Sequence, residues 1–311
     1  MVTPKVSVIM PLYNAEPFVE KAISSILNQT FKNFELLVLD DNSTDNSVKV
    51  VSRFNDERLH LIRNEKNLGV GPTLNRGVEI SRGTYLARMD ADDLAHPERL
   101  TIQCRYLDQH PEISLVGTDI IRVDIQGKPM EGQFRNPHSW GKIKWHMYLN
   151  CCIAHPTIMM RKEFFDISGN YQLSFAEDYL LWLTAIRKGL KICNLPQTLL
   201  DYRIHSKSIS ASKFTQQINS CGEILREHVH ATLGINLDLK SAGFNFLLAD
   251  RPIPFREVLK LIPFYVSIVW GCLRDKETTL TDFLFIFRRT SGRLLKGLLR
   301  SVRFRTTEYN L

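Results

Sequence analysis

The sequence lacks a hydrophobic run long enough to cross a membrane. Its most apolar stretch, Leu261–Leu273, has 13 residues, against the roughly 20 that a transmembrane helix needs. We also expect no signal peptide, because the short apolar run Val6–Met10 is cut off by Pro11. A cytoplasmic location is therefore expected, with any membrane contact made from the surface.

The sequence also lacks cysteine pairs at metal-ligand spacing. Its six cysteines are scattered from residue 104 to residue 272, and only Cys151 and Cys152 are neighbours. A chain of 311 residues with 44% hydrophobic residues can bury a large core without disulfides. This use of cysteine fits a reducing compartment.

Two common nucleotide-binding motifs are missing. No Gly-x-Gly-x-x-Gly follows the first predicted strand, which argues against an ordinary dinucleotide site. No Gly-Lys-Ser/Thr occurs either, which argues against a P-loop. The turn after the first strand, Pro11–Asn14, contains neither Lys nor Arg.

Charge is not distributed evenly along the chain. Residues 251–311 hold 12 Lys and Arg against 5 Asp and Glu, whereas residues 1–250 hold 28 of each. The net charge of +7 therefore belongs entirely to the C-terminal part. Whatever that part contacts is expected to be anionic.

The first 90 residues alternate short apolar runs with amphipathic segments. Strands are predicted at residues 5–10, 34–39, 59–62 and 83–88, with helical spacing of apolar residues between them. Such alternation is typical of an α/β fold with a doubly wound, mostly parallel sheet and helices on both faces. Because strand-helix-strand connections are right-handed, the strand ends are expected at one edge.

Three polar turns are expected at that edge, at Pro11–Asn14, Asp40–Asp45 and Asp90–Asp93. Clustered carboxylates repel one another unless a cation joins them. The last turn therefore predicts a hard divalent ion, Mn²⁺ or Mg²⁺, held by oxygen. The alternative is a helix N-cap within a solvated acidic loop. For the Gly-rich turn Asn67–Gly71, a phosphate contact and a plain loop are both open.

Regular alternation fades after a long strand predicted at residues 113–123. A helix is expected within residues 137–150, another opens at 175–179 and ends at Gly189, and a last strand is predicted at 199–205. A polar linker, 206–212, follows it. We therefore divide the chain into a domain of residues 1–210 and a helical region of residues 211–311, with helices at 209–233 and 242–249.

The C-terminal region contains an amphipathic helix of unusual composition. Apolar residues line one helical face, at Leu284, Phe287, Leu295, Leu298 and Val302. Basic residues crowd elsewhere on it, at Arg288, Arg289, Arg293, Lys296, Arg300, Arg303 and Arg305. This pattern predicts peripheral contact with an anionic membrane, and the alternative is a helix packed on the domain with a solvated basic face. Nucleic acid is not expected, because aromatic residues are not interleaved with the basic ones.

Taken together, the turns resemble the family 2 glycosyltransferases, an inverting family with the GT-A fold. The resemblance covers about residues 3–205 and rests on five stretches in the order of the family. They are Val6–Asn14, Val38–Asp45, Asn67-Leu68-Gly69 with Asn75, Met89–Asp93, and Glu177-Asp178. The region from about residue 211 is not covered by it.

The resemblance implies a nucleotide-sugar donor at the sheet edge. Asp92 matches a direct metal ligand, and Asp90 matches a group that holds the ribose or reaches the metal through water. Asp93 is expected to cap a helix, or to support the ligands, rather than to bind the metal directly, and it is the one of the three expected to be dispensable. Asp41 would accept a hydrogen bond from the imide N–H of the base, which favours uracil or thymine. The remaining donor contacts implied are Pro11, Tyr13, Asn67 and Gly69.

The same resemblance assigns the chemistry. Asp178 matches the catalytic base that takes the proton of an acceptor hydroxyl, and Glu177 is expected to shape the acceptor site. The alternative for this pair is ordinary N-terminal helix charge. His205 resembles a histidine used near the metal or the diphosphate, and a structural role for it is equally open.

We therefore predict a metal-dependent, inverting glycosyltransferase that moves a single sugar from a nucleotide diphosphate donor, a UDP-sugar, to a glycan or lipid-linked acceptor hydroxyl. The Gln/Arg-x-x-Arg-Trp stretch of processive synthases is missing, since no Arg-Trp pair occurs in the chain. One alternative is a nucleotidyltransferase acting on a sugar phosphate, which would normally carry a basic Gly-rich loop after the first strand. The other is a donor-binding scaffold without catalysis.

Overall fold

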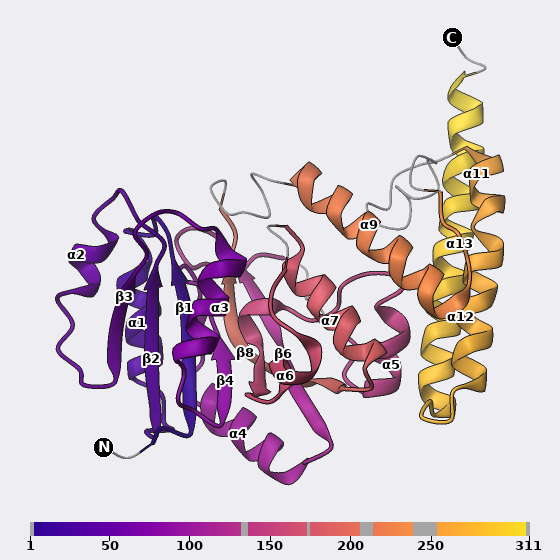
Figure 1. The fold of residues 1–311 in the computed structure, drawn as a ribbon. Coiled ribbons are helices and arrows are strands. Elements are labelled where there is room, and N and C mark those ends of the chain that lie inside the picture. Colours follow the sequence, from indigo (N-terminus) through magenta and orange to yellow (C-terminus); the bar gives the residue numbers. More distant parts are fainter. Residues whose placement is uncertain (1–2, 132–135, 173–174, 206–213, 239–253, 309–311) are drawn as a thin grey trace. The chain divides into compact units, whose positions relative to one another are not determined.

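The structure, a computed structural model, describes residues 3–131, 136–172, 175–205, 214–238 and 254–308, with side chains described up to residue 300. The chain forms two compact units (Figure 1). The first comprises Met1–His138 with Ile153–Ser212, and the second comprises Ser139–Cys152 with Lys213–Leu311. The C-terminal helices therefore share their unit with a segment, Ser139–Cys152, that comes from within the predicted domain of residues 1–210.

The first unit is built on an eight-stranded sheet of order β3-β2-β1-β4-β7-β6-β8-β5. Four neighbouring pairs are parallel and three, which involve β5 and β7, are antiparallel. The strands are β1 Val6–Leu12, β2 Phe34–Asp40, β3 Leu59–Arg63, β4 Tyr85–Arg88, β5 Leu94–Ala95, β6 Ile113–Val123, β7 Met159–Arg161 and β8 Lys191–Arg203.

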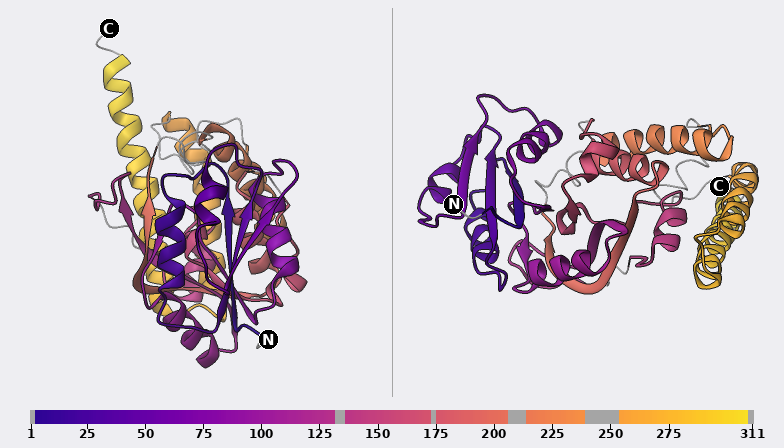
Figure 2. Two further views of the ribbon diagram at one scale, coloured as in Figure 1. Left: turned by 90° about the vertical axis from the view of Figure 1, so that its left-hand side faces the viewer. Right: turned by 60° about the horizontal axis from the view of Figure 1, so that its bottom comes forward.

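Helices lie on both faces of this sheet (Figure 2, left), and the predicted doubly wound α/β architecture is confirmed. They are α1 Val19–Leu27, α2 Ser47–Val51, α3 Val70–Ile80, α4 Arg99–Gln109, the 3-10 turn η1 His155–Thr157, α6 Phe164–Ser168 and α7 Glu177–Arg187. Every residue of β2 is buried, as its continuous apolar run predicts for a strand covered on both sides. Each buried Leu, Ile or Val contributes about 2 kcal/mol of apolar burial.

Strand β8 starts eight residues before the predicted strand at 199–205. Pro196 lies inside it and cannot donate a ladder hydrogen bond, so the local sequence does not resemble a strand. The pairing of β8 with β6 absorbs this residue through a register shift between Thr118 and Asp119. The two-residue strand β5 then pairs with β8, Leu94 opposite Asp201, and so ties the acidic turn to the end of β8.

The second unit is helical. Its helices are α5 Trp140–His146, α9 Phe214–Leu233, α11 Phe255–Lys260, α12 Ile262–Arg274 and α13 Leu280–Glu308. Within this unit Ser139 donates to Asp282 at 2.6 Å, and Lys144 pairs with Asp275 at 2.7 Å. In the parts of the chain that the structure describes, no helix combines the length and apolar composition needed to cross a membrane. The predicted helix at 242–249, the linker at 206–212 and the side chains of Val302, Arg303 and Arg305 lie outside those parts.

Candidate active site

The strand register brings the three polar turns to one edge of the sheet. Leu12 at the end of β1 pairs with Asp40 at the end of β2, and Ile9 of β1 pairs with Arg88 at the end of β4. The backbone N–H of Asp41 also donates to the carbonyl of Leu12 at 2.8 Å. The turns that follow these strands are therefore fixed side by side by backbone hydrogen bonds.

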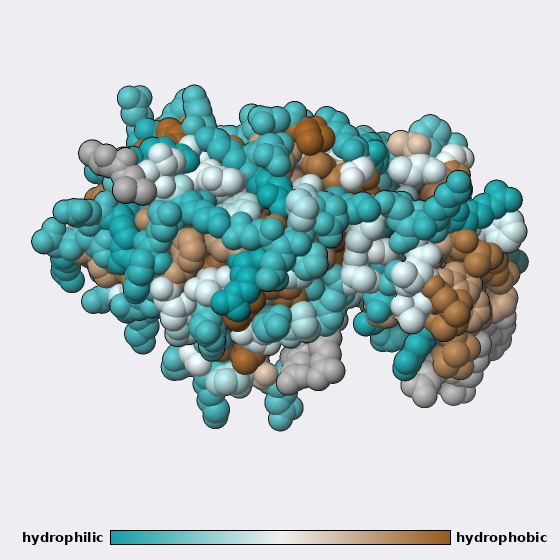
Figure 3. Space-filling model, turned by 90° about the horizontal axis from the view of Figure 1, so that it is seen from below, coloured by the Kyte–Doolittle hydropathy of each residue, from teal (hydrophilic) through white to brown (hydrophobic). Residues whose placement is uncertain are grey.

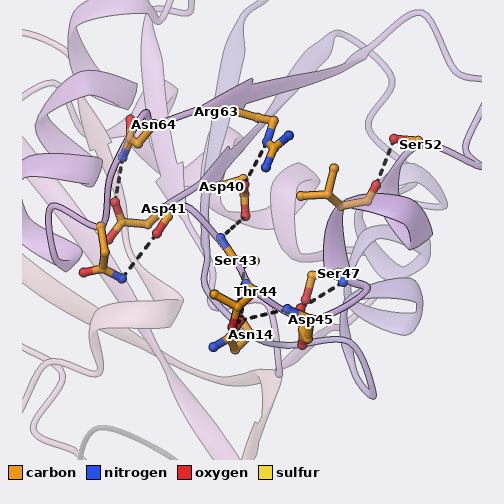
Figure 4. A network of polar contacts seen from close by, with 12 residues as sticks. Asn14, Asp40, Asp41, Ser43, Thr44, Asp45, Ser47, Ser52, Arg63 and Asn64 are labelled. Atoms are coloured by element: carbon orange, nitrogen blue, oxygen red, sulfur yellow. Dashed lines mark hydrogen bonds and ion pairs between the residues drawn. The ribbon is translucent and has the colours of Figure 1, made fainter.

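The turns after β1 and β2 are bound to each other by side chains (Figure 4). Oδ1 of Asn14 accepts hydrogen bonds from the backbone N–H groups of Thr44 at 2.8 Å and Asp45 at 3.3 Å. Asp40 accepts from the N–H of Ser43 and pairs with Arg63, both at 3.1 Å, so it stabilises the turn itself. These contacts hold the edge of the site rigid.

Asp41 holds the Gly-rich turn against the end of β2. Its Oδ1 accepts from Nδ2 of Asn64 and from the N–H of Leu68, and its Oδ2 accepts from the N–H of Gly69, all at 2.8 Å. Asn67 donates to the Asp41 carbonyl at 3.2 Å. A carboxylate offers about four acceptor positions. Among the described residues one position therefore remains without a donor, on Oδ2.

Two further predicted donor residues lie on the same edge. Pro11 is part of β1, opposite Leu39 of β2, and Tyr13 follows with a side chain that is 52% exposed. An exposed aromatic ring at the end of a strand offers a face for stacking a base. Stacking of the base on Tyr13 remains a prediction.

The acidic turn forms a compact carboxylate cluster. One oxygen from each of Asp90, Asp92 and Asp93 lies within 4.8 Å of the others. The three have unlike surroundings, however. Asp90 and Asp92 are partly exposed, whereas Asp93 is 1% exposed and accepts from the backbone N–H of Arg203 through Oδ1 at 2.9 Å. Asp93 caps no helix, since α4 begins after Glu98, and the expected capping role was wrong.

Arg88 places a positive charge beside the carboxylate cluster. Its guanidinium forms a two-point ion pair with Asp90, in which Nη1 lies 2.7 Å from Oδ2. Burial raises the pKa of Asp90 to about 6, with the charges of Asp92 and Asp178 adding to the rise and Arg88 opposing it. Burial, reinforced by its two acidic neighbours, raises the pKa of Asp93 well above its ordinary value.

His205 completes the cluster from the end of β8. Its Nε2 lies 2.8 Å from Oδ2 of Asp92, and its ring stacks on Phe18 with centroids 5.0 Å apart. The pairing of β5 with β8 and the Asp93–Arg203 hydrogen bond together bring this histidine to the acidic turn.

The residues fit a hard divalent cation. Oxygen ligands predominate, and one buried carboxylate oxygen, Oδ2 of Asp93, has no hydrogen-bond partner among the described residues. Asp92 and His205, whose side chains lie 2.8 Å apart, would both be able to bind such an ion. Mn²⁺ and Mg²⁺ both suit such a donor set.

Helix α7 begins with Glu177 and Asp178, and the residue before them has a strained backbone conformation. Ala176 directly before them has φ +56°, which is unfavourable for a residue with a Cβ. Oδ1 of Asp178 accepts from the N–H of Tyr179 at 2.8 Å. Burial raises the pKa of Asp178, and Arg88 opposes the rise. The charge of Asp178 contributes to the raised pKa of Asp90, so α7 starts near the acidic turn.

Glu177 faces a buried polar group that the sequence did not reveal. Burial, and then the charge of Asp178, raises the pKa of Glu177 to about 8. Nδ1 of His155 lies 3.8 Å from Glu177, and its Nε2 lies 2.9 Å from the Tyr171 hydroxyl. Burial keeps the pKa of His155 well below its ordinary value, so the imidazole is neutral. Asn75 holds the backbone of Tyr171 through two hydrogen bonds, at 2.9 and 3.0 Å.

Sequence reasoning missed Arg88, His155 and Tyr171. A signal existed only for Arg88, an arginine inside an otherwise apolar strand directly before three aspartates. His155 and Tyr171 come from loops whose proximity to α7 depends on the tertiary fold.

Comparison with known proteins identifies the class. The model of the family Glycosyl transferase family 2 matches residues 7–167, and the chain belongs to this family. It is 32% identical over 243 residues to the amylovoran biosynthesis glycosyltransferase AmsE of Erwinia amylovora, covering 76% of this chain and 88% of AmsE. It is 30% identical over 218 residues to the Escherichia coli UDP-Glc:α-D-GlcNAc-diphosphoundecaprenol β-1,3-glucosyltransferase WfaP, covering 68% of this chain and 82% of WfaP.

Solved structures show the same fold. Residues 1–349 of TarS from S. aureus, in complex with UDP-GlcNAc, superpose with a TM-score of 0.59 at 18% identity, covering 97% of this chain and 92% of that one. The mannosyltransferase PcManGT from Pyrobaculum calidifontis, in complex with GDP-Man and Mn²⁺, also gives 0.59, at 15% identity with coverage of 97% and 88%. The protein is a glycosyltransferase with the GT-A fold.

Proposed function

We propose that this protein transfers one sugar from a UDP-sugar to an acceptor hydroxyl, with inversion at the anomeric carbon. The observation that supports it best is the meeting of two carboxylate groups at one sheet edge: the Asp90–Asp93 cluster with His205, and the Glu177–Asp178 pair. The first group suits a diphosphate bound with a cation, and the second suits proton abstraction.

The hydrogen bonds of Asp41 favour uracil over guanine in the donor. Guanine presents two neighbouring N–H donors and needs a free acceptor position on both carboxylate oxygens. Uracil presents one imide N–H. Since Oδ1 of Asp41 already accepts two hydrogen bonds and Oδ2 accepts one, a single position remains. Pro11 and Tyr13 would form the wall of the base pocket, and Asn67 and Gly69 would keep the Gly-rich turn beside it.

Asp92 and His205 would hold the divalent cation, Mn²⁺ or Mg²⁺, with Asp90 contacting the ribose or reaching the ion through water. The chemistry that such a cation supplies when bound is stabilisation of the negative charge on the leaving diphosphate. Asp90 must release Arg88 at least in part to take up this role, since the two now form a two-point ion pair.

Asp178 would act as the base. As the acceptor oxygen attacks the anomeric carbon, the bond from that carbon to the diphosphate oxygen breaks on the opposite face. The hydroxyl proton passes to the Asp178 carboxylate. A raised pKa makes this carboxylate a better proton acceptor than an ordinary aspartate. Glu177, protonated near neutral pH, would donate a hydrogen bond to the acceptor.

The acceptor in this proposal is a lipid-linked glycan precursor, used at the cytoplasmic face of a membrane with peripheral contact to anionic lipid. The name of WfaP specifies a diphosphoundecaprenol-linked acceptor, and AmsE is named for the biosynthesis of a polysaccharide, which supports this choice. The basic C-terminal region is consistent with it.

The test is a donor screen that measures nucleotide release from UDP-, GDP- and dTDP-sugars with Mn²⁺ or Mg²⁺ present and after chelation. We expect UDP release that chelation abolishes. Pyrophosphate release from UTP and a sugar phosphate would instead favour the nucleotidyltransferase. Donor binding without turnover, in the presence of undecaprenyl-diphosphate-linked acceptors, would favour the inactive scaffold.

A further inference from the structure

Exposed apolar side chains concentrate in the second unit, along α11 and α12. They recur every three or four residues, which puts them on one side of nearly continuous helix, and each is 36–60% exposed. We call this row the α12 stripe, and it consists of Phe255, Leu259, Ile262, Val266, Trp270 and Leu273. At 1.5 Å per residue it is about 28 Å long.

Helix α13 carries a second row, which we call the α13 stripe. Its members are 50–72% exposed, and they are Leu280, Leu284, Phe287, Leu295 and Leu299. The buried side of the same helix is different, since Ile286 and Thr290 are at most 2% exposed. Helix α13 thus has one apolar side packed inside the unit and another that faces solvent.

The two helices pack against each other along their length, as Figure 1 shows. In the space-filling view of Figure 3, hydrophobic colour gathers over this helical pair. Monomeric proteins rarely expose contiguous apolar surface of this extent unless it contacts a protein or a membrane.

Basic residues accompany both stripes on one side. Arg256, Lys260 and Arg274 lie beside the α12 stripe, and Arg288 lies beside the α13 stripe. The other basic residues of α13 whose side chains are described lie on the opposite side of that helix, and they are Arg289, Arg293, Lys296 and Arg300. The guanidinium of Arg274 lies 4.5 Å from the centroid of the Trp270 ring. Apolar residues, tryptophan and a basic flank are the composition of a helix that lies in the interface of an anionic bilayer.

The acidic residues of this pair are engaged within the unit. Glu257 pairs with Lys260, Asp275 pairs with Lys144, Glu277 accepts from Trp140, and Asp282 accepts from Ser139. Two copies that met through their stripes would bring basic residues together without acidic residues to oppose them. The charges therefore favour anionic lipid over a second copy of the chain.

We propose that the α12 and α13 stripes insert into the headgroup region of an anionic membrane, with Arg256, Arg274 and Arg288 on lipid phosphates. This inference deepens the proposed use of a membrane-held acceptor. Binding to vesicles requires neither donor nor acceptor. The membrane proposal can therefore fail while sugar transfer is observed, and sugar transfer can fail while vesicle binding is observed.

The test is co-sedimentation of the full chain with vesicles of phosphatidylcholine alone or mixed with phosphatidylglycerol. We expect binding to the mixed vesicles only. The double variant Val266→Asp/Trp270→Asp should bind roughly a hundred-fold more weakly, because two charges enter the apolar layer. Arg256→Gln/Arg288→Gln should bind about thirty-fold more weakly. Ile125→Asp changes an equally exposed apolar residue of the first unit and should bind as the wild type does.

Tryptophan fluorescence gives a second readout. Lipids brominated in their acyl chains should quench the wild type, and Trp270→Phe should lose that quenching while it still sediments. The inference is overturned if the double aspartate variant, shown to be folded by circular dichroism, binds vesicles as tightly as the wild type. It is also overturned if the wild type ignores vesicles and sediments as a dimer that the same variant separates into monomers.

Discussion

The Asp92 carboxylate lies 2.8 Å from Nε2 of His205, although 113 residues separate them in the chain. The contact joins the turn after β4 to the end of β8. It brings together the two side chains that sequence analysis assigned to a metal, and it makes His205 a candidate ligand rather than an isolated histidine. The predictions below start from this pair.

His205→Ala should weaken metal dependence without unfolding the protein. Loss of a ligand or of its orienting partner typically lowers metal affinity 10- to 100-fold. The measurement is UDP release as a function of Mn²⁺ concentration, where the half-saturating concentration should rise by about that factor. His110→Ala changes a partly exposed histidine of the first unit and serves as the control. An unchanged Mn²⁺ curve would assign His205 a structural role only.

Asp93 should matter for stability rather than be dispensable. It is buried and fixes the end of β8 through the N–H of Arg203. Asp93→Ala leaves that donor unsatisfied and should lower the free energy of unfolding by about 1–3 kcal/mol. Asp93→Asn keeps an acceptor and should cost less. Urea unfolding of both variants checks this, and equal stability of Asp93→Ala and the wild type would contradict it.

The raised pKa of Glu177 should make the free energy of unfolding depend on pH. Its pKa is raised to about 8 by burial and by the charge of Asp178. Its contribution to stability is therefore fully present below its unfolded pKa of about 4.3, and it is lost as pH rises through about 8. Glu177→Gln cannot ionise, so its stability relative to the wild type should increase progressively between about pH 4.3 and pH 8 and stay constant above that. Urea unfolding across this range measures the difference, and a difference independent of pH would refute the assignment.

Asn75 should act on the reaction through the loop before α7. Its two hydrogen bonds hold the Tyr171 backbone, seven residues before Asp178. Asn75→Ala removes both and should misplace the base, lowering kcat about ten-fold with a smaller change in UDP affinity. Asn33→Ala, at an exposed turn, is the matched control. If UDP affinity and kcat fall together, Asn75 holds the donor pocket rather than the base.

The parts of the fold that were predictable are those with local signals. Strands β1 and β2 are continuous apolar runs, and each ends in a polar turn, so their pairing and their shared edge follow from the α/β pattern. The first half of β8 was not predictable, because Pro196 interrupts it and only the pairing with β6 accommodates that residue. Nor does any local pattern reveal that Trp140–His146 packs against α13, which begins 134 residues after His146.

The same distinction applies to the site. Asp41, Asp90, Asp92 and Asp178 follow strand ends or start a helix, which local sequence reveals. The local sequence predicts that Arg88 is the last residue of a strand. Its ion pair with Asp90 is seen only in the structure. The role of Asp93 changed for a similar reason, since its partner Arg203 is 110 residues away.

The central claim is that Asp178 removes the acceptor proton while the acidic cluster holds the donor. The most direct measurement compares the wild type with Asp178→Asn in two assays, UDP binding by calorimetry in the presence of Mn²⁺ and sugar transfer to a diphosphoundecaprenol-linked acceptor. We predict that UDP affinity stays within about two-fold, since Asp178 accepts from Tyr179 whereas Asp41, assigned to the base, accepts from Gly69. Transfer should fall about 10²- to 10⁴-fold. Transfer at the wild-type rate in Asp178→Asn would contradict the account.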